Sequence, residues 1–232
     1  DALAAFRLGF LSLTERATAE QLTSGCLQAL VKTIPDDEEN VPEELKKLRS
    51  SLARTYYANF SVFRSAPDTW AINQLFPVMP IHRLNEKPTE LGDFADLTCD
   101  SDGKISQFID NGQVKHLLEL HQIKEDEQYV IGMFLGGAYQ EVMGNLHNLF
   151  GTTNSVHVRL GVNGEYQLDH VVKANTKSDV LKAMEHNPEQ LLERLRIASE
   201  QAIQKGTLKI SDSQRLLDHL ETSLRQSTYL ND

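Results

Sequence analysis

A cysteine stands beside acidic side chains in one short stretch of the sequence. Cys99 is followed directly by Asp100, and Asp102 comes two residues later, just before Gly103. Asp, Ser and Gly are turn-forming residues, so this stretch predicts a loop, and loops on rigid elements often carry catalytic groups. A thiol can donate a proton while a neighbouring carboxylate holds a cationic group. An acidic turn with an incidental cysteine explains the same residues, so the loop alone leaves both interpretations open.

A second candidate lies where an apolar segment runs into a pair of glycines. Residues 129–135 predict a buried strand, and Gly136 and Gly137 follow it directly. Glycine lets a ligand approach the backbone closely, and a helix that begins there would favour an anion. Tyr139 adds a hydroxyl group that can hydrogen-bond a phosphate. A plain tight turn is the alternative, since a glycine pair by itself is weak evidence for a ligand.

Other sequence patterns that carry chemistry are missing. The eight histidines are scattered, and the five-residue spacing of His116 and His121 is not that of a zinc site. The stretch from Asp100 resembles a calcium loop only superficially, because Lys104 occupies a position that needs an oxygen ligand and Asn111 occupies the position of a bidentate Glu. GxSxG, Walker and GxGxxG motifs do not occur. We therefore expect no metal ligands in this chain.

Composition limits the possible partners. The chain has 232 residues, of which 40% are hydrophobic and 24% charged, as in a globular protein of one or two domains. A net charge of −10 argues against binding to nucleic acid or to an anionic membrane. No apolar run approaches the roughly 20 residues of a membrane span. Cys26 and Cys99 form no disulfide framework, so we expect a cytoplasmic protein.

The first part of the sequence is helical in its apolar spacing. Residues 1–58 predict helices, with an acidic connection at 35–42 and a further helix from Glu43 toward Tyr56. Cys26 lies on an apolar helix face, which predicts a buried thiol. The chain opens with Asp-Ala-Leu-Ala-Ala-Phe rather than Met, and this opening reads as a helix interior without a capping box. We therefore expect a piece of a longer polypeptide.

The middle of the sequence is rich in strand signals, and the last part is helical again. We expect a hairpin around Asn163-Gly164, and extended segments at 59–63, 70–81, 97–99, 105–109, 114–120 and 129–135. From Lys177 onward the spacing predicts helices: one begins at Asn187 and ends at Gly206, and the last is capped by Ser211 or Asp212. The order of elements predicts an α+β fold with segregated layers.

Three segments, taken together and in this order, resemble the biosynthetic arginine decarboxylases. They are Pro-Ile-His-Arg-Leu at 80–84, Leu-Thr-Cys-Asp-Ser-Asp-Gly-Lys at 97–104, and the stretch from Gly132 to Phe150 that contains Gly-Gly-Ala-Tyr-Gln-Glu and Gly-Asn-Leu-His-Asn-Leu-Phe. These enzymes use pyridoxal phosphate and have the alanine-racemase-like fold. The likeness extends over most of the chain, to the closing Thr-Tyr-Leu at 228–230.

The resemblance implies how the chain is organised. Residues 1–58 would be part of an inserted helical bundle, 59–175 a barrel-like β domain, and 176–232 a helical tail. The (β/α)8 barrel that binds the cofactor, with its Schiff-base lysine, is absent from this chain. We therefore expect the C-terminal part of the enzyme, inactive alone, with the N-terminal barrel portion and a second copy of the protein as partners in a homodimer or larger homo-oligomer.

The resemblance also implies roles for individual residues. Cys99 matches the cysteine that protonates the substrate after carbon dioxide leaves, and Asp100 matches the acid that binds the distal guanidinium of L-arginine. Asp102 would assist in substrate binding, and Tyr139 matches the tyrosine that contacts the cofactor phosphate. The product would be agmatine, in polyamine and spermidine biosynthesis. Magnesium is also implied, although this chain offers no ligand set for it. A non-catalytic assembly or regulatory module related to decarboxylases is the alternative.

Overall fold

The computed structural model describes residues 1–34 and 41–230, so the predicted acidic connection lies mostly outside the described residues. The chain divides into two compact units. Unit 1 comprises Asp1–Tyr56, Pro80–Asp93 and Lys115–Ile131, and unit 2 comprises Tyr57–Met79, Phe94–Val114 and Gly132–Asp232. Each unit is described by itself.

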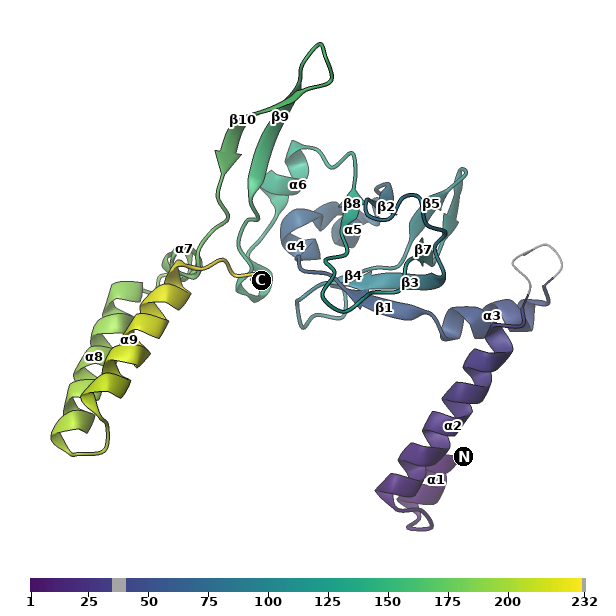
Figure 1. Cartoon of the computed structure of the whole chain (residues 1–232), viewed down its shortest axis with the longest axis horizontal. Coiled ribbons are helices and arrows are strands. Elements are labelled where there is room, and N and C mark those ends of the chain that lie inside the picture. Colours follow the sequence, from purple (N-terminus) through teal and green to yellow (C-terminus); the bar gives the residue numbers. More distant parts are fainter. Residues whose placement is uncertain (35–40, 231–232) are drawn as a thin grey trace. The chain divides into compact units, whose positions relative to one another are not determined.

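The helices of unit 1 are α1 (Ala2–Arg7), α2 (Leu13–Val31) and α3 (Glu43–Ser51), of which α1 contacts α2 (Figure 1). Asp1 caps α1 by accepting hydrogen bonds from the N–H groups of Leu3 and Ala4, and α1 has no capping box, as expected. Ser12 begins α2 with a capping box. Cys26 is exposed, not buried, because the apolar side chains of α2 lie at the surface of this unit.

The predicted third helix is shorter than expected. It ends at Ser51, and residues 54–57 form strand β1 (Arg54–Tyr57) instead. The ring of Tyr56 passes over Gly92, where a Cβ would lie 2.8 Å from the ring, and the Tyr56 hydroxyl donates to the carbonyl of His121. These long-range contacts favour the strand. In the same unit, β3 (Glu90–Ala95) pairs antiparallel with β7 (Leu118–Leu120).

Unit 2 combines short helices with small open sheets, and the described residues form no closed barrel. Its sheet pairings join the end of β3 to β4, β2 to β8, and β5 to β6. Its core includes the rings of Phe94 and Phe108, which meet edge to face 5.9 Å apart. The bounds are α4 (Val62–Ser65), α5 (Pro67–Ile72), β2 (Val78–Pro80), β4 (Lys104–Ile105), β5 (Phe108–Asp110), β6 (Gln113–Lys115), β8 (Ile131–Met133) and α6 (Ala138–Met143).

Several extended segments predicted in this region are wrong. Residues 62–65 form helix α4, because the buried Ser61 caps it by accepting from the N–H of Arg64. Residues 67–72 form α5. Residues 97–99 follow strand β3 as a bend rather than forming a strand. The segment 129–135 contributes only the half-buried β8, and Leu135 is 84% exposed.

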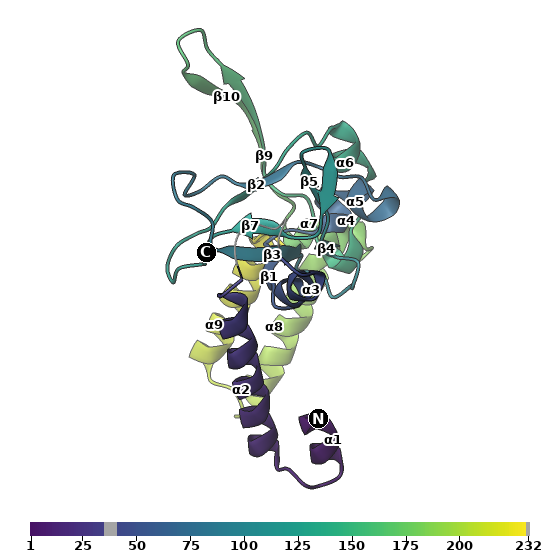
Figure 2. The same ribbon diagram turned by 90° about the vertical axis from the view of Figure 1, so that its right-hand side faces the viewer.

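The hairpin and the C-terminal helices follow the sequence closely. Strands β9 (Ser155–Leu160) and β10 (Tyr166–Val172) pair antiparallel around a turn in which Gly164 has a φ of 78° (Figure 1). They are followed by α7 (Lys177–Ala183), α8 (Pro188–Gln204) and α9 (Ile210–Arg225), and α8 and α9 lie side by side (Figure 2). Asn187 caps α8 as predicted. The predicted cap of α9 is wrong, because Lys209 occupies that position. The α+β class is confirmed.

Candidate functional site

The loop that carries Cys99 is built around the buried carboxylate of Asp96. This side chain is 2% exposed and accepts hydrogen bonds from the backbone N–H groups of Val62 and Thr98, both at 2.8 Å, and from the Thr98 hydroxyl at 2.6 Å. The backbone N–H of Asp96 donates to the carbonyl of Gly103 at 2.8 Å. A Cβ at position 103 would overlap the Asp96 carboxylate. Asp96 therefore holds both ends of the loop, one through its carboxylate and the other through its backbone N–H.

Cys99 lies exposed on this loop and faces a turn far away in the sequence. The side-chain amide Nδ2 of Asn148 donates to Cys99 Sγ at 3.4 Å. Asn148 has a left-handed backbone conformation, with φ 53° and ψ 24°. Asparagine tolerates this conformation better than most residues. The structure thus gives the thiol a polar neighbour.

Asp100 faces the same turn through His147. Its side chain is 35% exposed, and Oδ1 accepts a hydrogen bond from the backbone N–H of Asp102 at 2.9 Å. Oδ2 lies 3.3 Å from Nε2 of His147. That nitrogen is buried and has no aligned hydrogen-bond partner among the described residues. The His147 ring packs on Phe63 with 4.3 Å between ring centroids.

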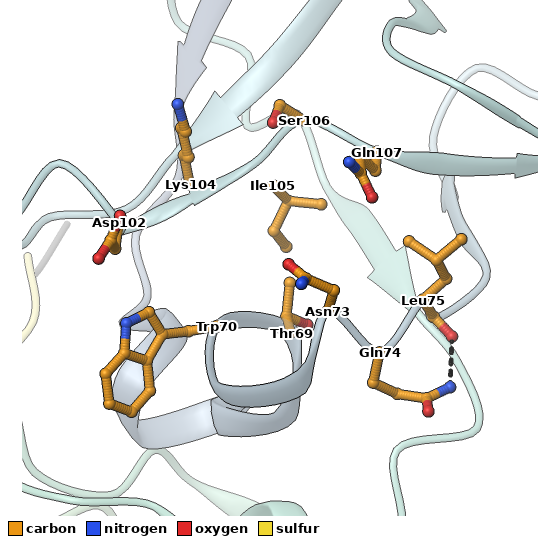
Figure 3. Close-up of a pocket in the computed structure, with 10 residues that line it drawn as sticks. All are labelled: Thr69, Trp70, Asn73, Gln74, Leu75, Asp102, Lys104, Ile105, Ser106 and Gln107. Carbon is orange, nitrogen blue, oxygen red and sulfur yellow. Dashed lines mark hydrogen bonds between the residues drawn. The ribbon is translucent and has the colours of Figure 1, made fainter.

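Asp102 belongs to the same loop, but its side chain lines a different cavity. This cavity of about 310 Å³ lies between α5 and β4, with Asp102 and Trp70 at one end (Figure 3). The Lys104 side chain extends away from Trp70 (Figure 3). Asp102 is exposed and its backbone, not its carboxylate, contacts Asp100. The structure therefore brings Cys99 and Asp100 to one turn and leaves the Asp102 carboxylate beside the cavity.

Tyr139 lies in the first turn of α6, and 74% of its surface is exposed. The preceding Gly136 and Gly137 line a second cavity of about 250 Å³, together with Arg64 and the hydroxyl residues Thr152, Thr153 and Ser155. A Cβ at Gly137 would meet nothing within 4 Å, so the backbone there is open to approach. Arg64 Nη1 donates to the carbonyls of Glu141 and Gly144, which fixes the end of α6.

Sequence reasoning missed three residues of this site. Asp96 precedes the predicted loop, and only its burial shows that it organises the loop. His147 and Asn148 lie in a segment without helical or strand spacing, and their backbone turn has no sequence signal apart from Asn itself. Among the described residues, no group of three or more His, Cys, Asp or Glu side chains is arranged to hold a metal ion. No helix of the described chain is long and apolar enough to cross a membrane.

Two families match the ends of the chain. The arginine decarboxylase helical bundle domain matches residues 1–49, and the arginine decarboxylase C-terminal helical extension matches residues 178–230. By these matches, residues 1–49 and 178–230 resemble the helical bundle and the C-terminal extension of arginine decarboxylases, and the mixed helix and strand fold between them is consistent with this likeness.

Individual proteins similar to this chain carry the same enzyme name. The chain is similar to the biosynthetic arginine decarboxylase of Prochlorococcus marinus (strain MIT 9313), with 70% identity over 99% of this chain and 35% of the relative. That of Synechococcus sp. (strain RCC307) is 67% identical over 100% of this chain and 36% of the relative. The crystal structure of the biosynthetic arginine decarboxylase from Campylobacter jejuni matches with a TM-score of 0.74 and 31% identity, over 99% of this chain and 36% of that chain. The chain thus spans little more than a third of the length of these relatives.

Proposed function

We propose that this chain supplies substrate-binding and proton-donating groups to a pyridoxal-phosphate-dependent arginine decarboxylase, which converts L-arginine to agmatine and carbon dioxide. The reaction would serve polyamine biosynthesis. The observation that carries the proposal is the pairing of Cys99 with Asp100 on a loop whose two ends are held by the buried Asp96. A fixed loop keeps a proton donor and a cation-binding group at a set separation, which catalysis requires.

Asp100 is suited to bind the guanidinium group of arginine. Its carboxylate is partly exposed, and each oxygen retains a lone pair beyond the contacts with Asp102 and His147. A hydrogen bond between a guanidinium and a carboxylate is charge-assisted and stronger than one between neutral groups. Binding at the distal end of the substrate would leave its α-carbon free for the reaction.

Cys99 is suited to donate the proton that completes the reaction. Loss of carbon dioxide breaks the bond between the α-carbon and the carboxylate, and the electron pair must be held until a proton arrives. The Cys99 S–H bond then breaks, a C–H bond forms at the α-carbon, and the sulfur remains as a thiolate. The Cys99 thiol is exposed in this chain. A group that reacts with a substrate held by another part of the protein needs such exposure.

Pyridoxal phosphate supplies the electron sink for such decarboxylations. The residues near Tyr139 fit its phosphate: the tyrosine is mostly exposed, and the neighbouring cavity combines an open glycine backbone with hydroxyl groups and Arg64. The Tyr139 hydroxyl would donate to a phosphate oxygen. The lysine that binds the cofactor covalently would lie in the barrel portion, outside this chain. We therefore propose that the chain is inactive without that portion.

The exposure of Cys99 and Tyr139 also supports a site shared between subunits. Both side chains face outward from unit 2, so groups from another part of the assembly can reach them. We propose that this chain completes the barrel of a second copy in a homodimer or larger homo-oligomer. Closed symmetric assemblies of this kind place equivalent sites at each interface.

The test replaces Cys99 by Ala in the full-length enzyme and measures agmatine formed from L-arginine. Loss of a general acid predicts a decrease of about 10²–10⁴-fold in kcat. Cys26→Ala is the matched control, because Cys26 is also an exposed thiol but lies on α2 in the other unit. We expect that variant to keep wild-type activity.

The outcomes separate the proposal from its alternative. A non-catalytic assembly module predicts that Cys99→Ala and Cys26→Ala behave alike. If Cys99→Ala forms agmatine at the wild-type rate, the catalytic role of the thiol is wrong. Bound cofactor, followed by its absorbance, and the circular dichroism spectrum show whether the variant is folded and loaded.

A further inference from the structure

The turn at residues 147–148 faces both candidate groups of the loop at once. Asn148 donates to the Cys99 sulfur at 3.4 Å across 49 residues of sequence, and His147 Nε2 lies 3.3 Å from the Asp100 carboxylate. The two contacts come from adjacent residues. Neutral sulfur is a weak hydrogen-bond acceptor, whereas a thiolate accepts a charge-assisted bond.

The backbone of this turn adopts a conformation that few side chains tolerate. Asn148 has a φ of 53° and Leu149 a φ of 64°. Consecutive non-glycine residues with positive φ are uncommon, and such backbone persists only where the surrounding structure holds it. Observed backbone strain of this kind often marks a functional site.

Surrounding contacts hold the turn in place. The N–H of His147 donates to Asn145 Oδ1 at 2.9 Å, and the N–H of Leu149 donates to the Leu146 carbonyl at 2.8 Å. The N–H of Asn145 donates to the carbonyl of Phe63 at 3.1 Å, and Phe63 is 2% exposed beneath the His147 ring. The Asn148 side chain is therefore directed at Cys99 from a fixed support.

We propose that Asn148 is a positioning residue that orients the Cys99 sulfur and stabilises the thiolate left after proton transfer. The proposal rests on the proposed function for the role of Cys99 as proton donor. When the S–H bond breaks and the proton moves to the α-carbon, the Asn148 Nδ2–H group is already placed to donate to the resulting negative sulfur. His147, on the same turn, places its Nε2 beside the Asp100 carboxylate.

The test compares variants at position 148 in the full-length protein. Asn148→Asp keeps the size and turn tolerance of the side chain but replaces the donor amide by a carboxylate. Asn148→Gly keeps the positive φ and removes the side chain. Leu149→Gly is the matched control, because it relieves the neighbouring positive φ and leaves the amide in place.

The measurement is the rate at which iodoacetamide alkylates Cys99 as a function of pH, resolved by peptide mass spectrometry. Only the thiolate reacts, and the nearby ionisable residues Asp100 and His147 are unchanged in all variants. We expect Asn148→Asp to lower the rate near neutral pH about tenfold, because a facing carboxylate disfavours the thiolate. Asn148→Gly lowers it by a smaller factor, and Leu149→Gly leaves it unchanged. Cys26, exposed on α2, reports any general change in reactivity.

Decarboxylation kinetics supply a second measurement. We expect Asn148→Asp to lower kcat with little change in KM, since the amide contacts the sulfur and not Asp100. Alkylation of Cys99 in Asn148→Asp within twofold of the wild-type rate would overturn the proposal. The alkylation result stands even if the protein forms no agmatine, so failure of the proposed function and failure of this inference are distinguishable.

Discussion

At the residue scale, Asp96 connects the two ends of the loop that holds Cys99 and Asp100. Its carboxylate accepts hydrogen bonds from Thr98, and its backbone N–H donates to the Gly103 carbonyl. Gly103 leaves the space that this carboxylate occupies. Gly103→Ala would place a Cβ against the Asp96 carboxylate and the Thr98 hydroxyl. We expect a loss of about 1–3 kcal/mol in the free energy of unfolding, since packed groups must move. Denaturant unfolding followed by circular dichroism measures it.

The control for that change is Gly25→Ala in α2. A Cβ at this position meets nothing within 4 Å. Alanine is favoured over glycine in a helix by about 1 kcal/mol, so we expect a small gain in stability. Equal effects of the two substitutions would contradict the account of the Asp96 loop.

Tyr229 gives a prediction about pH. Burial raises the pKa of its hydroxyl to about 12, and the hydroxyl donates to the carbonyl of Gly151 at 2.8 Å. Because the folded-state pKa lies above the unfolded value, this group leaves stability intact below about pH 10 and lowers it as the pH rises toward 12. The difference in phenolate absorbance between the wild type and Tyr229→Phe should show a titration midpoint near pH 12. Titration at the ordinary tyrosine value would contradict the buried placement.

At the residue scale, the sequence could predict Cys99 and Asp100 because their types and adjacency suggest chemistry. It could not predict Asn148, because the contact joins residues 49 positions apart through a strained turn. Cys26 shows the opposite error. Its apolar spacing predicts burial, but burial depends on what covers the helix, and the residue is exposed.

Among the elements, α4 is the short helix that links the loop to the core of unit 2. Its cap Ser61 is fully buried and accepts from the N–H of Arg64 at 3.3 Å, and the helix carries the buried Val62 and Phe63. Ser61→Ala should therefore lower the free energy of unfolding by about 1 kcal/mol or somewhat more. Thermal unfolding of the variant provides the measurement. Ser24→Ala, at an exposed position inside α2, should be nearly neutral.

Local sequence signals account for some elements and fail for others. The hairpin follows from its Asn-Gly turn, and α8 follows from the capping Asn187. The segment at 59–63 alternates like a strand, yet it enters α4, because the N–H of Val62 donates to Asp96 from 34 residues away. Non-local contacts of this kind override local propensity.

At the scale of the whole molecule, the hairpin of β9 and β10 carries an exposed apolar face. One of its faces carries six apolar side chains in cross-strand pairs, namely Val156 with Val171, Val158 with Leu168, and Leu160 with Tyr166. Alternation predicts that such a face is buried, but all six side chains are exposed in this chain. The Asn-Gly turn predicts the strand pairing, but the burial of a face depends on what packs against it, which local sequence does not encode. The chain spans 35–36% of the length of the relatives that it matches.

The central claim is that this chain completes a decarboxylase site on another copy of the protein. The most direct measurement mixes two full-length variants that are each inactive: Cys99→Ala, and one in which the cofactor-binding lysine outside this chain is replaced. Random exchange makes half of the dimers mixed, each with one intact site, so agmatine formation should recover to roughly a quarter of the wild-type rate. No recovery, when native mass spectrometry shows that subunits have exchanged, would contradict the claim.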